Sequence, residues 1–188
     1  MPMSAALHSS FPGLPRIQRL ARCVRLMCLL GIGFSLALPL ALWGQPDWLS
    51  EVVQQEWGLR GQPFQLDARA RGFGLLACAL PSLLLAYLLW QLYALFGRYQ
   101  RGEVWTLRCA VRLRRAALAM TALAPALPLS KTLSILALTL GNPPGQRMLN
   151  LSFSGQDYLT LLLGLVLLAI ATVMREAVRM AEENAEFV

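Results

Sequence analysis

Four long apolar stretches constrain this chain more than any other feature. They lie at about residues 24–43, 72–96, 116–140 and 158–174. Each is close to the roughly 20 residues that a helix needs to cross a bilayer core. The chain is 56% hydrophobic and only 14% charged, whereas a soluble domain carries about 25% charged residues. We therefore predict an all-α integral membrane protein that forms a four-transmembrane-helix bundle.

A basic stretch between the second and third apolar segments predicts how the chain is threaded. Residues 97–115 hold six arginines and one acid, Glu103. Basic loops of this kind stay on the cytoplasmic side, which predicts an N-in/C-in topology in the bacterial cytoplasmic (inner) membrane. The net charge of +7 raises the question of nucleic acid, but the arginines cluster at the ends of apolar segments. We therefore expect contact with anionic lipid headgroups and no direct nucleic-acid binding.

The two ends of the chain are predicted to differ in structure. Residues 1–15 lack periodicity and contain Pro12, Gly13 and Pro15, which predicts a disordered cytoplasmic leader before a single membrane domain over residues 16–188. A basic start followed by an apolar run also describes a signal peptide. The run is longer than usual and has no clean cleavage site, so we favour an uncleaved first span. Residues 175–188 are predicted to continue the last helix into the cytoplasm, with Arg179 and Glu183 paired.

The two outer loops carry weaker patterns. Residues 50–57 suit a short helix on the bilayer surface. Residues 64–68 and 148–153 alternate between apolar and polar side chains, which is the period of a strand. We predict that these two segments pair into a small two-stranded β cap in the extracytoplasmic loops.

Small residues spaced four apart predict where helices approach each other closely. Three such ridges occur in the apolar segments. They are Gly33/Ala37/Ala41, Gly74/Cys78/Ser82/Ala86 and Ala122/Ala126/Ser130/Ser134.

The third apolar segment contains the only lysine of the chain, Lys131, after Pro125 and Pro128. The prolines predict a broken helix. A lysine inside a span costs roughly 2.5–3.5 kcal/mol, which favours a functional residue with Ser130 and Ser134 as its neighbours. The alternative is that its amine snorkels to the outer surface, because it lies nine residues from the outer end of the segment. The sequence leaves both interpretations open.

A candidate contact surface lies on the cytoplasmic side. Thr106 predicts the start of a helix at Leu107, and the sequence S-x-x-D at residues 154–157 predicts another start. The first of these helices carries three arginines on one face, and the acids of the last helix are a second contact candidate, although a solvated helix end is the simpler interpretation. The five candidate contact residues are Arg108, Arg112, Arg115, Glu182 and Glu183.

The residue types needed for enzyme chemistry are sparse. The only histidine, His8, falls in the predicted leader, and the cysteine spacing does not suit zinc. There is no glycine-rich phosphate loop and no Ser/His/Asp combination. We therefore expect no catalytic residues, no cofactor, no metal site and no enzyme activity.

Most of residues 20–188 resemble a known family, and the resemblance is strongest after Gly97. Residues 95–115 read LFGRYQRGEVWTLRCAVRLRR. Residues 142–188 read NPPGQRMLNLSFSGQDYLTLLLGLVLLAIATVMREAVRMAEENAEFV. This second stretch closes with Glu182, Glu183, Asn184, Phe187 and Val188. These features resemble the bacterial membrane family named domain of unknown function (DUF) 2975. The resemblance implies four spans, no established activity, and a small helix-turn-helix regulator as a partner.

Two functions follow as hypotheses. The first is a regulatory or sensory membrane protein that acts through its cytoplasmic face. The second is a small transporter or channel subunit that uses Lys131. A second copy of the chain, in a homo-oligomer, is a further candidate partner for either.

Overall fold

A computed structural model describes residues 14–55, 57, 64, 66–103, 106–143 and 149–186, with backbone alone for residues 14–17 and 185–186. The described residues form helices and no strand. The helices are α1 (Leu14–Gly44), α2 (Pro46–Gln55), α3 (Ala68–Tyr99), α4 (Leu107–Thr139) and α5 (Gly155–Glu186). All except α2 are long and apolar enough to cross a membrane. The chain is therefore a multi-pass membrane protein by the length and composition of its helices.

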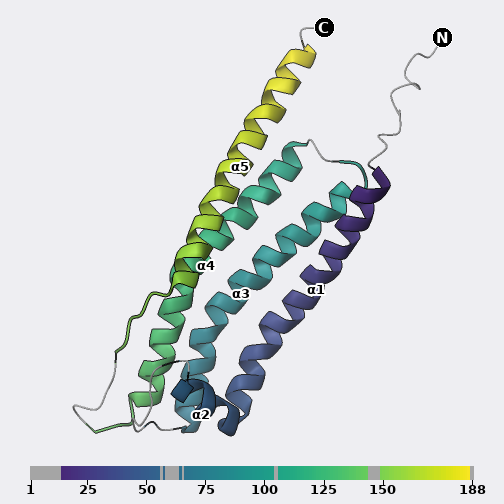
Figure 1. Cartoon of the computed structure of the whole chain (residues 1–188). Coiled ribbons are helices and arrows are strands. Elements are labelled where there is room, and N and C mark those ends of the chain that lie inside the picture. Colours follow the sequence, from purple (N-terminus) through teal and green to yellow (C-terminus); the bar gives the residue numbers. More distant parts are fainter. Residues whose placement is uncertain are drawn as a thin grey trace, which may run out of the picture.

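The four long helices form an open row. α1 packs on α3, α3 on α4, and α4 on α5 (Figure 1). Within the described residues, α1 makes no close approach to α4 or α5, so the row does not close into a ring. The start of α1, the α3–α4 turn and the end of α5 lie at one end, which we call the arginine end. The opposite end holds α2, and we call it the α2 end.

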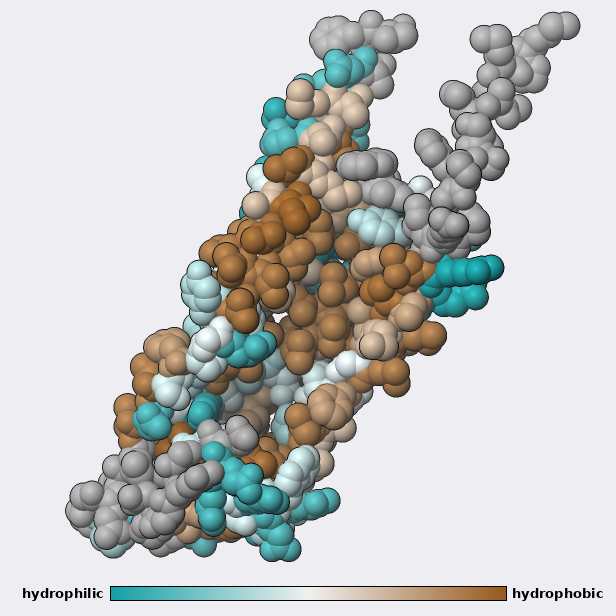
Figure 2. Space-filling model, viewed as in Figure 1, coloured by the Kyte–Doolittle hydropathy of each residue, from teal (hydrophilic) through white to brown (hydrophobic). Residues whose placement is uncertain are grey.

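Hydrophobic side chains cover the middle of the row. Figure 2 shows a brown hydrophobic band between hydrophilic patches at the two ends. Large apolar side chains of α1 and α5 are exposed there, among them Leu30, Phe34 and Val173. Exposed apolar surface of this extent is typical of a face in contact with lipid.

Two predicted helix starts are confirmed by their caps. At α4, the Thr106 hydroxyl oxygen accepts a hydrogen bond from the Cys109 backbone N–H at 3.3 Å. At α5, the Ser154 N–H donates to the Asp157 carboxylate at 2.8 Å, and the Asp157 N–H donates to the Ser154 hydroxyl at 3.3 Å. These bonds satisfy backbone N–H groups that the first turn of a helix leaves without partners.

The predicted leader ends earlier than expected. α1 begins at Leu14, which leaves residues 1–13 of the predicted leader outside the described structure. Pro15 is therefore helical. A proline fits the first turn of a helix because no N–H is needed there.

The predicted β cap is wrong. Phe64 and Leu66 have irregular backbone and Ala68 is already helical, while residues 149–154 form no regular structure. Phe64 and Leu66 pack instead against the apolar cluster beside α2. Residues 149–154 contact α4 instead, where the Thr132 hydroxyl donates to the Asn150 carbonyl at 3.0 Å.

The predicted break in the third span is also wrong. α4 runs without interruption through Pro125 and Pro128. The Thr132 hydroxyl lies 2.9 Å from the Pro128 carbonyl of the same helix, so its one proton is shared between this carbonyl and that of Asn150. Prolines are tolerated in membrane helices when neighbouring groups satisfy the backbone that they disturb.

The short predicted helix is present as α2, which starts four residues earlier than the predicted residue 50. Leu49 and Val53 on α2 are fully buried. They join Trp43, Ile135 and Leu138 in one apolar cluster. This cluster fixes the α2 end of α1, α3 and α4 in one body.

Candidate functional site at the arginine end

The arginine face predicted on α4 is completed by α3. Arg108, Arg112 and Arg115 lie at positions i, i+4 and i+7, so they share one side of α4. Arg98, near the end of α3, meets them across the turn. These four arginines line one cavity of about 250 Å³ together with Leu107 and Val111. The sequence reasoning missed Arg98 as a member, although a short turn between antiparallel helices was the signal that could have placed it there.

Two of the four arginines are held in place. The Arg98 guanidinium forms an ion pair with Glu103 at 3.2 Å. Arg112 donates to the side-chain oxygen of Gln91 at 3.3 Å, and Gln91 is only 4% exposed. Arg108 and Arg115 are exposed, and no ion pair to either side chain is found in the described part of the chain.

A tight turn positions Glu103 beside Arg98. Gly102 has a φ of +82°, a backbone conformation that favours glycine. The Glu103 N–H donates to the Arg98 carbonyl at 3.1 Å. The buried Cys109 thiol donates to the Glu103 carbonyl at 3.1 Å. The turn is therefore fastened to both α3 and α4.

Arg25 joins α1 to the same end of the molecule. Its two terminal nitrogens donate to the Gln100 side-chain oxygen and to the Tyr93 hydroxyl, each at 2.7 Å. Its guanidinium carbon lies 4.3 Å from the centroid of the Tyr93 ring. Gln18 adds a bond of 3.3 Å from its amide to the Gln100 carbonyl. No sequence pattern pointed to this network, because it depends on the register between α1 and α3.

One of the candidate acids at the end of α5, Glu183, is paired within its own helix. The predicted pair of Arg179 and Glu183 is confirmed, with 3.5 Å between the nitrogen and the oxygen. Arg179 also pairs with Glu176 at 3.1 Å. Glu182 and Glu183 are exposed, and within the described ranges no ion pair links either to the arginine face. The structure therefore does not bring these two candidate groups together.

Lys131 lies far from the arginine face, level with the end of α1. It is half-buried, whereas its neighbours Ser130 and Ser134 are buried. The Ser134 hydroxyl lies 3.7 Å from the Cys78 sulfur. That sulfur also accepts the Trp43 indole N–H at 3.4 Å, and Trp43 is next to the last residue of α1.

The register between α4 and α5 gives a second, independent indication of where Lys131 lies along the row of helices. Gly164 of α5 lies so close to Thr121 that a Cβ on the glycine would be 2.8 Å from the Thr121 nitrogen. Near the start of α5, Tyr158 shares a cavity of about 490 Å³ with Pro125. Lys131 lies six residues farther along α4, or about 9 Å at 1.5 Å per residue. It is therefore beyond the start of α5, on the side of the α2 end.

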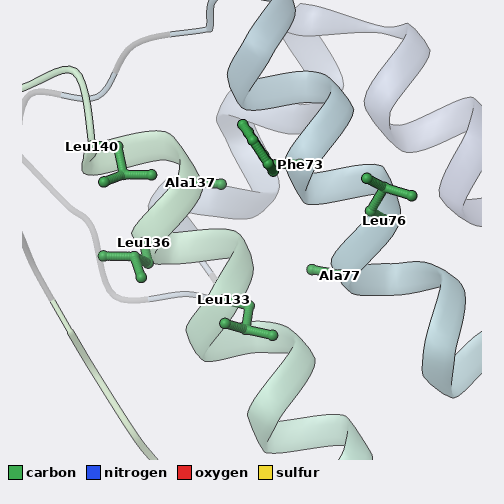
Figure 3. Close-up of a pocket in the computed structure, with 7 residues that line it drawn as sticks. All are labelled: Phe73, Leu76, Ala77, Leu133, Leu136, Ala137 and Leu140. Carbon is green, nitrogen blue, oxygen red and sulfur yellow. The ribbon is translucent and has the colours of Figure 1, made fainter.

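An apolar cavity of about 340 Å³ opens between α3 and α4 near the α2 end. Figure 3 shows that the side chains around it come from both helices and carry only carbon. They are Phe73, Leu76, Ala77, Leu133, Leu136, Ala137 and Leu140. None of these side chains offers a polar group to orient a solute.

The described residues contain no group of three or more His, Cys, Asp or Glu side chains that could hold a metal ion. The cysteines Cys23, Cys28, Cys78 and Cys109 are all free thiols. Cys78 and Cys109 take part in the hydrogen bonds described above. Their part in this structure is therefore packing and hydrogen bonding.

A comparison with protein families agrees with the resemblance read from the sequence. The family model described as "Protein of unknown function (DUF2975)" matches residues 45–188. The match includes all of α2, α3, α4 and α5. No curated protein and no solved structure matches the chain.

Proposed function

This chain belongs to the DUF2975 family of proteins of unknown function, and we propose that it is a non-enzymatic regulatory or sensory component of the bacterial inner membrane. The observation that carries the proposal is the gathering of charged side chains at one end of an otherwise apolar row. Arg25, Arg98 and Arg112 come together there from α1, α3 and α4. Basic residues beside membrane helices face the cytoplasm, which supports an N-in/C-in topology.

The spacing along α4 supports a specific placement in the bilayer. Arg112 and Lys131 are 19 residues apart, which is about 28 Å along a helix. The hydrocarbon core of a bilayer is about 30 Å thick. We propose that the arginine face lies at the inner boundary and Lys131 at the outer boundary.

The segment before α5 supports the same placement. Residues 149–154 are irregular and run beside α4, where Asn150 meets Thr132. Irregular backbone exposed to lipid does not occur inside the hydrocarbon core. This part of α4 therefore belongs at or outside the outer boundary.

The partner surface in this proposal combines the arginine face with the end of α5. Since Gly164 lies level with Thr121, Val178 lies level with Leu107, where α4 begins. The helix after Val178 projects beyond α4 (Figure 1) and exposes both acidic and basic side chains. A projecting charged helix beside a basic face suits a protein partner, and the family resemblance suggests a small helix-turn-helix regulator.

The transporter alternative gains less support from the geometry. It needs Lys131 within the bilayer, but the registers of α1 and α5 both favour the outer boundary for this residue. The apolar cavity between α3 and α4, which includes Leu133, has a lining to which Lys131 does not contribute. We therefore interpret Lys131 as a boundary residue whose amine reaches the outer surface.

A crosslinking pulldown from the cytoplasmic side tests the proposed function. We expect the double substitution Glu182→Lys and Glu183→Lys to lower recovery of the crosslinked partner at least about threefold, because it reverses charge on the contact surface. Lys131→Leu is the control and is expected to leave recovery unchanged. Solute flux is followed in the same cells. If Lys131→Leu changes flux while the double substitution leaves partner recovery intact, the transporter alternative replaces this proposal.

A further inference from the structure

We propose that the cavity between α3 and α4 at the arginine end is a binding site for the phosphate group of an anionic glycerophospholipid. This inference rests on the membrane orientation of the proposed function and not on its protein partner. It differs from a general attraction of arginines to a membrane, because it assigns one lipid molecule to one cavity with a defined set of lining residues.

The charge of the cavity calls for an anion. Four arginine side chains line about 250 Å³, and no acidic residue is among the lining residues. Glu103 offsets only Arg98, at 3.2 Å. Like charges gathered around one cavity repel each other, so an anion that binds between them stabilises the folded protein.

Part of the site is already arranged to receive a phosphate. Gln91 holds Arg112 at 3.3 Å, and Glu103 holds Arg98. Guanidinium groups that are held in place lose less entropy when they bind phosphate oxygens. Arg108 and Arg115 are exposed and therefore able to close on the bound group.

The start of α4 adds a second source of positive potential. The cavity is lined by Leu107 and Arg108, the first two residues of that helix. The N-terminus of a helix carries a partial positive charge and backbone N–H groups that favour phosphate. The helix end therefore strengthens a site that the arginines define.

Apolar lining decides between a lipid and a free phosphate. Leu107 and Val111 line the same cavity and are 45% and 38% exposed. Further along the same helix, Leu118 is 47% exposed in the apolar band. Leu107 lies on the cytoplasmic side of the α4 arginines, whereas Val111 and Leu118 lie toward the membrane. A lipid places its phosphate among the arginines and its glycerol and acyl chains along Val111 and Leu118. A free phosphate ion makes no favourable contact with apolar side chains.

Native mass spectrometry of the purified chain in neutral detergent tests this site. The probes are phosphatidylglycerol, phosphatidylcholine and inorganic phosphate. We expect one phosphatidylglycerol to be retained per chain, phosphatidylcholine not to be retained, and excess inorganic phosphate not to displace the bound lipid. Displacement by inorganic phosphate would overturn the lipid assignment in favour of a free-anion site.

Two double variants of equal charge separate the cavity from bulk electrostatics. Arg108→Gln with Arg115→Gln removes two cavity arginines, while Arg101→Gln with Arg114→Gln removes two exposed arginines that do not line the cavity. We expect the first pair to weaken retention of phosphatidylglycerol about 25-fold, from roughly fivefold for each arginine. The control pair is expected to weaken it less than about threefold.

Equal losses in the two double variants would overturn the inference, and helical circular dichroism checks that both are folded. Arg98→Gln is a further variant if the first pair misfolds. Failure of lipid binding with intact partner recovery in the pulldown would reject this site alone. If the double substitution Glu182→Lys and Glu183→Lys leaves partner recovery intact while lipid binding is as expected, the proposed function alone is rejected.

Discussion

Arg25 illustrates how a charged residue in a membrane helix holds that helix, α1, against its neighbour α3. Its side chain is half-buried between α1 and α3, where it bonds to Tyr93 and Gln100. One guanidinium nitrogen, Nε, is buried without a described partner. The two bonds at 2.7 Å and the contact with the Tyr93 ring offset the cost of burying the charge.

Arg25→Leu tests this contribution. We expect the free energy of unfolding to fall by about 2 kcal/mol, because two charge-assisted hydrogen bonds are lost and their acceptors remain. Arg22→Leu is the matched control, since Arg22 is exposed on the same helix. Thermal unfolding in detergent measures both, and equal stabilities for the two variants would contradict the role of Arg25.

At the scale of the helices, α5 depends on a single neighbour. In the described part of the chain it packs only on α4. Its buried positions are Thr160, Gly164, Ala171 and Val178, which are small or β-branched and spaced by four or seven. Small side chains let two membrane helices approach closely where there is no hydrophobic effect between them.

Gly164→Ala is expected to loosen this contact. The added Cβ would lie 2.8 Å from the Thr121 nitrogen and 3.0 Å from its Cα, and backbone atoms cannot turn aside. We expect a loss of about 1–3 kcal/mol in stability, as for other overpacked sites. Gly72→Ala is the control, because nothing lies within 4 Å of its Cβ position. A Gly164→Ala protein as stable as the control in the same unfolding assay would show that α4 and α5 do not pack this closely.

Helix starts were predictable from the sequence, but helix faces only in part. Thr106 and Ser154 mark starts because a cap is a local interaction. On α4, Ala126, Ser130 and Ser134 of the predicted ridge are buried, while Ala122 is exposed. The ridge of Gly33, Ala37 and Ala41 is exposed, and α1 instead approaches α3 closely at Gly31, opposite Leu89. A membrane helix is apolar on all sides, so periodicity does not identify the face that meets another helix.

The ridge on α3 was predicted correctly at its first member. Gly74 is buried beneath the Trp43 ring, which occupies the space of a side chain. Cys78, the next member, is bonded to both Trp43 and Ser134. Here a glycine that leaves room for the Trp43 ring lies one turn from a cysteine whose sulfur forms hydrogen bonds. This combination indicates a helix contact more specifically than small size alone.

At the scale of the whole molecule, the register of neighbouring helices in the open row sets the depth at which each candidate residue lies. The depth of Lys131 depends on how α1 and α5 slide along their neighbours, and no local sequence pattern records this register. The same holds for the meeting of Arg98 with the α4 arginines. The family and the four spans could be predicted from the sequence, because they rest on composition and local motifs.

The measurement that tests the placement most directly is the labelling of single cysteines with a membrane-impermeant thiol reagent. The background lacks Cys23, Cys28, Cys78 and Cys109. Single cysteines replace Arg101 at the turn, Leu118 in the apolar band and Lys131. Right-side-out vesicles are labelled before and after they are opened.

We expect the cysteine at 131 to react from outside, the one at 101 to react only after opening, and the one at 118 not to react. This pattern places the arginine face inside and Lys131 at the outer boundary. A cysteine at 131 that is as unreactive as the one at 118, or a cysteine at 101 that reacts in sealed vesicles, would contradict it.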